Sequence, residues 1–359
     1  MKKTSTRTSG TVVGMDLGDQ YSHYYMMDSE GEEIERGRVR TTRAGISKRF
    51  SGMEKVKVVV EAGTHSAWVS RLLKELGHEV VVANPRKVQL ISANSNKNDG
   101  VDGELLARLG RADEKLLHPI QHRREQSQAD LELLKARDQL VAVRRKLINH
   151  IRGAVKSMGG RLKNCGTESF HQAVKGEIPE PIARAVEPLL ETIEKLTQQI
   201  RDYSRQIEKL CREKYQETEL LQQVHGVGDV TSLGFVLIVD DAGRFASSRQ
   251  VGCFVGLRPG KSQSGEQDPE LRITREGNPF LRRLLVQSAQ YILGPFGKDC
   301  ELRRWGLKLA GRGRKNAKKR AVVAVARKLA VLLHRLWVNG EVYDPFYGSH
   351  QHQPMALIS

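Results

Sequence analysis

The alternation of short apolar strands with helical segments between residues 11 and 115 constrains the fold of this chain more than any other feature. Residues 56–60 (VKVVV) form a β-branched run typical of a strand in a sheet centre. Residues 65–77 (HSAWVSRLLKELG) form an amphipathic helix that ends on glycine, and residues 78–84 (HEVVVAN) form another buried strand. Further strands are predicted at residues 11–16, 21–28 and 36–41. The segment is therefore predicted to be an α/β domain with a mixed sheet.

Charge and composition limit the kinds of partner that this chain can have. It has 359 residues with 59 Lys and Arg against 42 Asp and Glu, a net charge of +17 that favours nucleic acid as the partner. No apolar run approaches the roughly 18 residues that cross a membrane, and no secretory pattern follows the first residues. Four cysteines lie far apart without a CxxC pair, which indicates a reducing compartment. We expect a cytoplasmic protein with no membrane partner.

The second half of the chain reads as helical. A basic helix is predicted from residue 125 to about 158, and a second long helix from residue 181 to about 224. In the second helix apolar residues recur at alternating steps of three and four, which is the pattern of a coiled coil. Such a coil would serve dimerisation or bridge domains. The alternative is a long amphipathic helix packed within its own chain.

Basic residues gather in two places where they are predicted to bind nucleic acid. One is the helix at residues 125–158, and the other is the stretch between Glu301 and Glu341, which contains no acid. The candidates are Arg137, Arg144, Arg145, Lys146, Arg152, Arg314, Lys315, Lys318 and Lys319.

Four acids stand where a catalytic site would need them. Asp16 and Glu61 each end a predicted strand, and Asp99 and Asp102 lie three residues apart at the start of a predicted helix. Carboxylates in such positions can converge on two divalent cations, Mg²⁺ or Mn²⁺, which promote phosphoryl transfer. Taken singly, Asp16 is explained as a turn residue, and Asp99 and Asp102 as acids that favour a helix start. Glu61 has no comparable structural explanation.

The motifs VGMDLG, VVVEAGTHSAWVSRLLKELGHEVVVANP and NKNDGVDGELLARL resemble the Asp-Glu-Asp-Asp (DEDD) transposases of the IS110 family, which include Piv-type DNA invertases. The resemblance implies a RuvC-like N-terminal domain with the RNase H fold and maps the family's four acids onto Asp16, Glu61, Asp99 and Asp102. The chain departs from the family's last motif at Asn98 and Gly103, where the family usually has Thr and Ala.

The resemblance extends over roughly residues 10 to 335, because the segment from His225 to Ala289 is similar to the family's C-terminal transposase domain. It implies a nucleophilic serine, for which Ser264 fits best and Ser262 is the alternative. Residues near this loop that could grip phosphates are Arg272, Arg275, Asn278, Arg282 and Arg283.

The expected organisation follows from these motifs. We predict a RuvC-like nuclease domain at residues 1–120, a basic helical and coiled-coil segment at 121–222, a mainly α-helical transposase domain at 223–340 and a tail at 341–359. The resemblance also implies a prokaryotic, nucleoid-associated enzyme, a non-coding bridge RNA that pairs with donor and target DNA, and dimers that assemble into a tetramer.

Two other functions stay open at this stage. A metal-dependent, Holliday-junction-type nuclease would use the four acids and water without a serine. A non-catalytic RNA- or DNA-binding protein would keep a decayed nuclease fold, although the presence of all four acids argues against decay.

Overall fold

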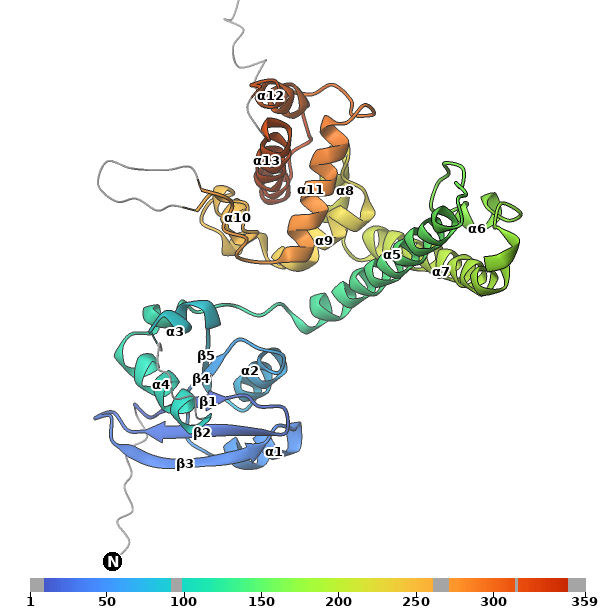
Figure 1. Ribbon diagram of the computed structural model, residues 1–359. Coiled ribbons are helices and arrows are strands. Elements are labelled where there is room, and N and C mark those ends of the chain that lie inside the picture. The colour runs from blue at the N-terminus through green and yellow to red at the C-terminus, as the bar shows by residue number, and fades with distance from the viewer. Residues whose placement is uncertain (1–9, 92–98, 261–270, 314–315, 348–359) are drawn as a thin grey trace, which may run out of the picture. The chain divides into compact units, whose positions relative to one another are not determined.

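The computed structural model describes residues 10–91, 99–260, 271–313 and 316–347, and for residues 89–91 and 99–100 the backbone alone. The chain divides into two compact units, residues 1–122 and 123–359, which are described separately (Figure 1). No helix in the described ranges has the length and apolarity that a membrane span requires.

A five-stranded mixed sheet forms the centre of the first unit, with the strand order β3-β2-β1-β4-β5. β1, β4 and β5 run parallel, and β2 and β3 pair antiparallel at the other side. The predicted strands are therefore confirmed within a few residues. Their bounds are β1 Val12–Asp16, β2 Tyr21–Met27, β3 Glu33–Arg40, β4 Lys57–Glu61 and β5 Glu79–Ala83.

Helices cover both faces of this sheet (Figure 1). α1 (Arg43–Phe50) and α2 (Ser66–Glu75) bury Phe50 and Leu73 against one face, in a core with Val13 and Met15 of β1. The helices on the other face are α3 Pro85–Ile91, α4 Asp99–Ala112 and the short 3-10 helix η1 Glu114–Leu117. Side chains of a strand alternate between faces, so consecutive β-branched residues fill two separate cores.

A long helical hairpin begins the second unit. α5 (Glu125–Ser157) and α7 (Glu180–Glu213) run antiparallel, because Arg137 contacts Ser204 while Arg144, further along α5, contacts Thr197, earlier on α7. The short α6 (Phe170–Ala173) lies between them in sequence and joins the apolar core at the closed end of the hairpin. The apolar stripe of α7 thus packs within its own chain, as the alternative interpretation expected. A coiled coil is not confirmed.

The remaining helices build a bundle around α9 (Asp229–Val239), which is buried over its last eight residues. The open end of the α5–α7 hairpin contributes Leu131, Leu134 and Ile207 to the same core. The other elements of the bundle are α8 Glu217–Gln222, η2 Ala242–Arg244, α10 Arg249–Phe254, α11 Pro279–Leu293, α12 Glu301–Ala310 and α13 Ala317–Asn339. The helical second half of the chain is confirmed.

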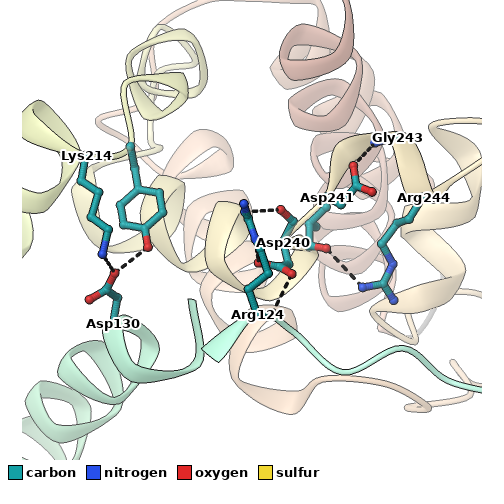
Figure 2. Close-up of polar contacts among 9 residues, drawn as sticks. Arg124, Asp130, Lys214, Asp240, Asp241, Gly243 and Arg244 are labelled. Atoms are coloured by element: carbon teal, nitrogen blue, oxygen red, sulfur yellow. Dashed lines mark hydrogen bonds and ion pairs between the residues drawn. The ribbon is translucent and has the colours of Figure 1, made fainter. Parts of the chain in front are cut away.

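Polar contacts fix the start of α5 to this bundle (Figure 2). The carboxylate of Asp240 accepts hydrogen bonds from the backbone nitrogen of Arg124 at 3.0 Å and from its Nε at 3.1 Å. Burial opposes ionisation of Asp240, but the hydrogen bonds from Ser127 and Arg124 outweigh it and lower the pKa of this carboxyl group. Further along α5, Asp130 accepts a hydrogen bond from the hydroxyl group of Tyr215 at 2.5 Å.

Candidate active site

Asp16 and Glu61 are the last residues of two neighbouring parallel strands, so they lie side by side at the carboxyl ends of these strands. In the ladder between β1 and β4, Met15 lies opposite Val60, so Asp16 and Glu61 are the next residues along the two strands. Neighbouring strands are about 4.8 Å apart. Both acids are half-buried. The register therefore brings together two acids that are 45 positions apart in the sequence.

The two acids also belong to the same face of the sheet. Val12 on β1 and Val59 on β4 pack in the core beneath α4, and Asp16 and Glu61 follow them at even spacing along their strands. Because side chains two residues apart share a face, both carboxylates lie on the side that α4 covers.

Two glycines let α4 approach this face closely and bring Asp102 with it. A Cβ at Gly14 of β1 would lie 2.0 Å from the carbonyl oxygen of Gly103 and 2.5 Å from the backbone nitrogen of Ala107. Asp102 directly precedes Gly103 and is half-buried. The contact therefore sets Asp102, in the first turn of α4, beside the end of the strand that carries Asp16.

Sequence reasoning noted the departure at Gly103 but missed its partner, Gly14. The signal was present, because a glycine inside an apolar strand often marks a close approach of another backbone. A Cβ at Gly103 would lie 3.3 Å from the carbonyl oxygen of Gly14, a tight contact that a small backbone shift relieves, so Gly14 is the position that requires glycine.

Asp99 is the first residue of α4, and its side chain lies outside the described part of the structure. Within the described ranges, no three His, Cys, Asp or Glu side chains come close enough to hold a metal ion together. Carboxylate oxygens are nevertheless the donors that Mg²⁺ and Mn²⁺ take in proteins, so the chemistry of Asp16, Glu61 and Asp102 fits either cation.

The candidate serines, Ser264 and Ser262, fall in residues 261–270, outside the described residues. The two chain segments that flank this stretch lie against each other. Pro259 forms an antiparallel bridge with Ile273, and the backbone nitrogen of Gly260 donates to the carbonyl oxygen of Arg272 at 2.9 Å. The described residues on the two sides of the serine segment therefore lie side by side between α10 and α11. We call this pair of segments, residues 256–260 and 271–277, the neck.

Two glycines form the base of this neck, and both have positive φ. A Cβ at Gly256 (φ 67°) would lie 1.8 Å from the carbonyl oxygen of Glu276, and one at Gly277 (φ 86°) would lie 1.8 Å from that of Phe254. No other residue fits these positions without moving the backbone.

The predicted phosphate-binding residues near the neck divide into two groups. Arg272 and Arg275 are exposed, and Arg275 adopts a left-handed φ of 56° while its backbone nitrogen donates to Gly256. These two side chains are available to a ligand next to the serine segment.

The other three have structural partners. Asn278 caps α11 by accepting a hydrogen bond from the backbone nitrogen of Leu281, and Arg282 donates to the carbonyl oxygen of Val255 at 2.9 Å. Arg283 pairs with Asp138 of α5 at 2.5 Å. Their contacts hold α11 in place.

The basic residues of α5 differ in accessibility. Arg145 and Lys146 are exposed. Arg144 is 6% exposed and its guanidinium hydrogen-bonds Thr197, and burial lowers its pKa. Arg144 faces α7 rather than solvent, so we leave it out of the proposed nucleic-acid interface. Helical spacing alone did not separate it from its neighbours.

Arg137 and Arg152 are half-buried and donate to other parts of the hairpin. Arg137 hydrogen-bonds Ser204 at 2.9 Å, and Arg152 donates to the carbonyl oxygen of Lys163 at 3.3 Å. Each guanidinium thus supports the hairpin, in addition to any role in binding.

Lys318 and Lys319 are exposed in the first turn of α13, a turn without any acid. Arg314 and Lys315 lie outside the described residues. Cations at a helix N-terminus oppose the helix dipole, so this placement costs stability unless an anion binds there.

Comparison with known proteins identifies relatives along most of the chain. Residues 13–159 match the DEDD model of IS110 transposases, and residues 218–297 match the family described as "Transposase IS116/IS110/IS902 family". The chain is 28% identical over 343 residues to the transposase for insertion sequence element IS1111A of Coxiella burnetii, covering 92% of this chain and 91% of that one. It is 25% identical over 342 residues to the transposase for IS1328 of Yersinia enterocolitica, covering 93% and 98%. A probable family 20 transposase of Pseudomonas aeruginosa is 25% identical over 340 residues, covering 93% and 98%.

Proposed function

Because the chain belongs to the IS110 family of transposases, we propose that it cleaves and rejoins DNA strands at the ends of an insertion sequence. The observation that carries this proposal is the placement of Asp16 and Glu61 at the ends of adjacent parallel strands, on the face where α4 brings Asp102. A mixed five-stranded sheet with an acid at the end of its central strand supports a RuvC-like domain with the RNase H fold.

The four acids would hold one or two divalent cations, Mg²⁺ or Mn²⁺. When bound, such cations activate the attacking oxygen and stabilise the leaving oxygen of a phosphodiester. Asp16 and Glu61 would orient the site because they stand on paired strands, and Asp102 would complete it from α4, the helix on which Asp99 is the first residue. In this proposal the nuclease domain corresponds to residues 1–120.

Ser264 would act as the nucleophile. Its hydroxyl oxygen bonds to phosphorus, the DNA oxygen opposite leaves with a proton, and the resulting phosphoserine retains the energy needed to rejoin strands. The neck formed at Gly256 and Gly277 supports this role, because the described residues on either side of the serine segment are held together within the proposed transposase domain, residues 223–340.

The proposed partners are donor DNA, target DNA and a bridge RNA. The net charge of +17 supports this assignment, as do exposed cations on α5, beside the neck and on α13. RNA that co-purifies with the protein should match the DNA beside its gene when sequenced. Recovery of unrelated RNA alone would remove the guide from the proposal.

We also propose a homo-oligomer in which the segment at residues 121–222 joins subunits. A groove along α5 and α7, lined by Leu133, Leu140 and Tyr203, supports this, since these apolar side chains are half-buried within one chain. The serine of one subunit would then meet the acids of another.

Strand cleavage of a supercoiled plasmid that carries the element and its flanks tests the proposed chemistry. Asp16→Asn and Glu61→Gln should each reduce cleavage by about 100-fold or more, because each removes a carboxylate charge that would hold a divalent cation. Glu79→Gln is the matched control. Glu79 is the first residue of β5 and lies opposite Lys57, the first residue of β4, so it is at the other end of the strands from Asp16 and Glu61. Full cleavage by both site variants would refute the carboxylate site.

A further inference from the structure

The row of side chains that contains the acids continues across the sheet to an arginine. In the ladder between β1 and β2, Asp16 lies opposite His23, and in the ladder between β2 and β3, His23 lies opposite Arg38. Paired residues share a face, so Arg38, His23, Asp16 and Glu61 follow one another across four strands. Arg38 stands two strands from Asp16, or about 10 Å between their backbones.

A second arginine joins the first above an aromatic ring. Arg40 lies opposite Tyr21 in the same ladder. The guanidinium carbon of Arg38 is 4.8 Å from the centroid of the Tyr21 ring, and that of Arg40 is 5.9 Å from it. Both guanidinium groups are thereby held near one half-buried ring, although both arginines are exposed.

Among the described residues, these two arginines differ from their neighbours in forming no ion pair. Arg36, on the same strand and face, pairs with Glu33, and Arg108 on α4 pairs with Glu104. Within the ranges that the structure describes, Arg38 and Arg40 form no ion pair with a carboxylate. Their positive charge is thus left for an external anion.

Within the described residues, the body of α4 after its first turn lies away from this part of the face. Gly103 meets β1 at Gly14, and Gly110, further along the helix, meets Val12 and Val59 toward the opposite end of the strands. The first turn of α4 therefore lies level with the Asp16 row, the rest of the helix runs away from it, and the row of Tyr21 lies farther from the body of the helix.

A protective role at the sheet edge does not account for the arrangement. β3 is an edge strand (Figure 1), and charges on edge strands prevent pairing with other chains. A charge of either sign, on either face of the edge strand, would prevent such pairing. Here the two arginines, which have no ion pair in the described part of the chain, lie on the carboxylate face, with Arg38 in register with the acids.

We infer that Arg38 and Arg40, positioned by Tyr21, bind the phosphate backbone of the DNA strand whose scissile phosphate lies at Asp16 and Glu61. The guanidinium fork matches phosphate oxygens, and an arginine about 10 Å from the acids reaches a phosphate that flanks the cleaved one. This inference rests on the proposed function, because it takes the cleaved strand to lie at the carboxylates.

Salt-dependent binding tests the inference without requiring cleavage. The Asp16→Asn protein, with and without Arg38→Gln plus Arg40→Gln, is titrated with a fluorescent DNA duplex over a range of salt concentrations. Loss of one or two phosphate contacts should reduce the slope of log K against log salt by about 1 to 2. Arg36→Gln is the matched control and should leave the slope unchanged, because Arg36 is already paired with Glu33.

Arginine modification by phenylglyoxal gives a second readout on the unmutated protein, in case the double variant fails to fold. DNA should protect Arg38 and Arg40 but not Arg36. An unchanged slope, modification unaffected by DNA, or protection by RNA and not by DNA would each overturn the inference. If DNA protects both arginines but the protein never cleaves DNA, the proposed function fails and the phosphate-binding surface stands.

Discussion

Gly14 of β1 and Gly103 of α4 contact each other through their backbones, so closely that a Cβ on Gly14 would lie 2.0 Å from the carbonyl oxygen of Gly103. The reverse contact is looser, at 3.3 Å from a Cβ on Gly103 to the carbonyl oxygen of Gly14. The pair connects the strand that ends on Asp16 with the helix turn that carries Asp102.

This asymmetry predicts opposite outcomes for two similar substitutions. Gly14→Ala should push α4 off the sheet, lower the free energy of unfolding by about 3 kcal/mol and impair cleavage. Gly103→Ala should be tolerated within about 1 kcal/mol, since a shift of a few tenths of an ångström relieves the contact. Thermal unfolding and plasmid cleavage measure both effects, and equal behaviour of the two variants would show that the close approach does not position α4.

The tight contacts in the neck predict that two further glycine substitutions will have different effects. Gly277→Ala should disable cleavage or unfold the bundle, because it combines positive φ with a contact of 1.8 Å to the carbonyl oxygen of Phe254. Gly340→Ala is the control, since Gly340 also has positive φ but has nothing within 4 Å of its Cβ. It should cost only about 1–2 kcal/mol. Stability is read from chemical denaturation, and a Gly277→Ala protein as stable and active as the control would contradict the predicted role.

Asp240 predicts how stability depends on pH. Its folded pKa is lowered, so its hydrogen bonds with Ser127 and Arg124 stabilise the fold above the ordinary carboxyl value of 3.8. That contribution is lost as pH falls through the lower, folded pKa. Asp240→Asn should lower the free energy of unfolding by about 1–2 kcal/mol at pH 7. In the variant, the free energy of unfolding should also fall less steeply as the pH is lowered. Denaturation monitored by circular dichroism between pH 7 and 3 checks this, and parallel curves for the two proteins would refute it.

Neutralising the two lysines at the start of α13 should stabilise the fold and weaken nucleic-acid binding. Lys318→Gln with Lys319→Gln should raise the free energy of unfolding by about 0.5–1 kcal/mol by relieving the helix dipole. It should also reduce the salt slope of DNA or RNA binding. Lys195→Gln, which neutralises an exposed lysine within α7, is the control for charge. Unaltered nucleic-acid affinity in the double variant would exclude this helix end from the interface.

Local pattern was enough to predict the strands that carry the acids. β1 and β4 are mainly β-branched or apolar and end on Asp16 and Glu61, so composition and boundary signals agree. The register that makes the two acids neighbours is a property of strand pairing, and no local pattern contains it. The same holds for Arg38, which sequence reasoning left unremarked within an edge strand.

Tertiary contacts explain where the sequence-based boundaries failed. The second long helix was predicted to continue to about residue 224, but α7 ends at Glu213 and α8 begins at Glu217. No glycine or proline marks the break. Tyr215 instead donates to Asp130 of α5, so a partner 85 residues away competes with helix continuation. α1 was missed because it buries only Ile46 and Phe50.

Covalent trapping tests the central claim most directly. The protein is incubated with element DNA and divalent cation, denatured, and digested, and the DNA-linked peptide is identified by mass spectrometry. Wild-type protein should yield a phosphodiester adduct on Ser264, lost in Ser264→Ala and in Asp16→Asn but kept in Glu79→Gln. Cleavage by Ser264→Ala at the wild-type rate, with free DNA ends and no adduct, would contradict serine chemistry and favour a nuclease that uses water.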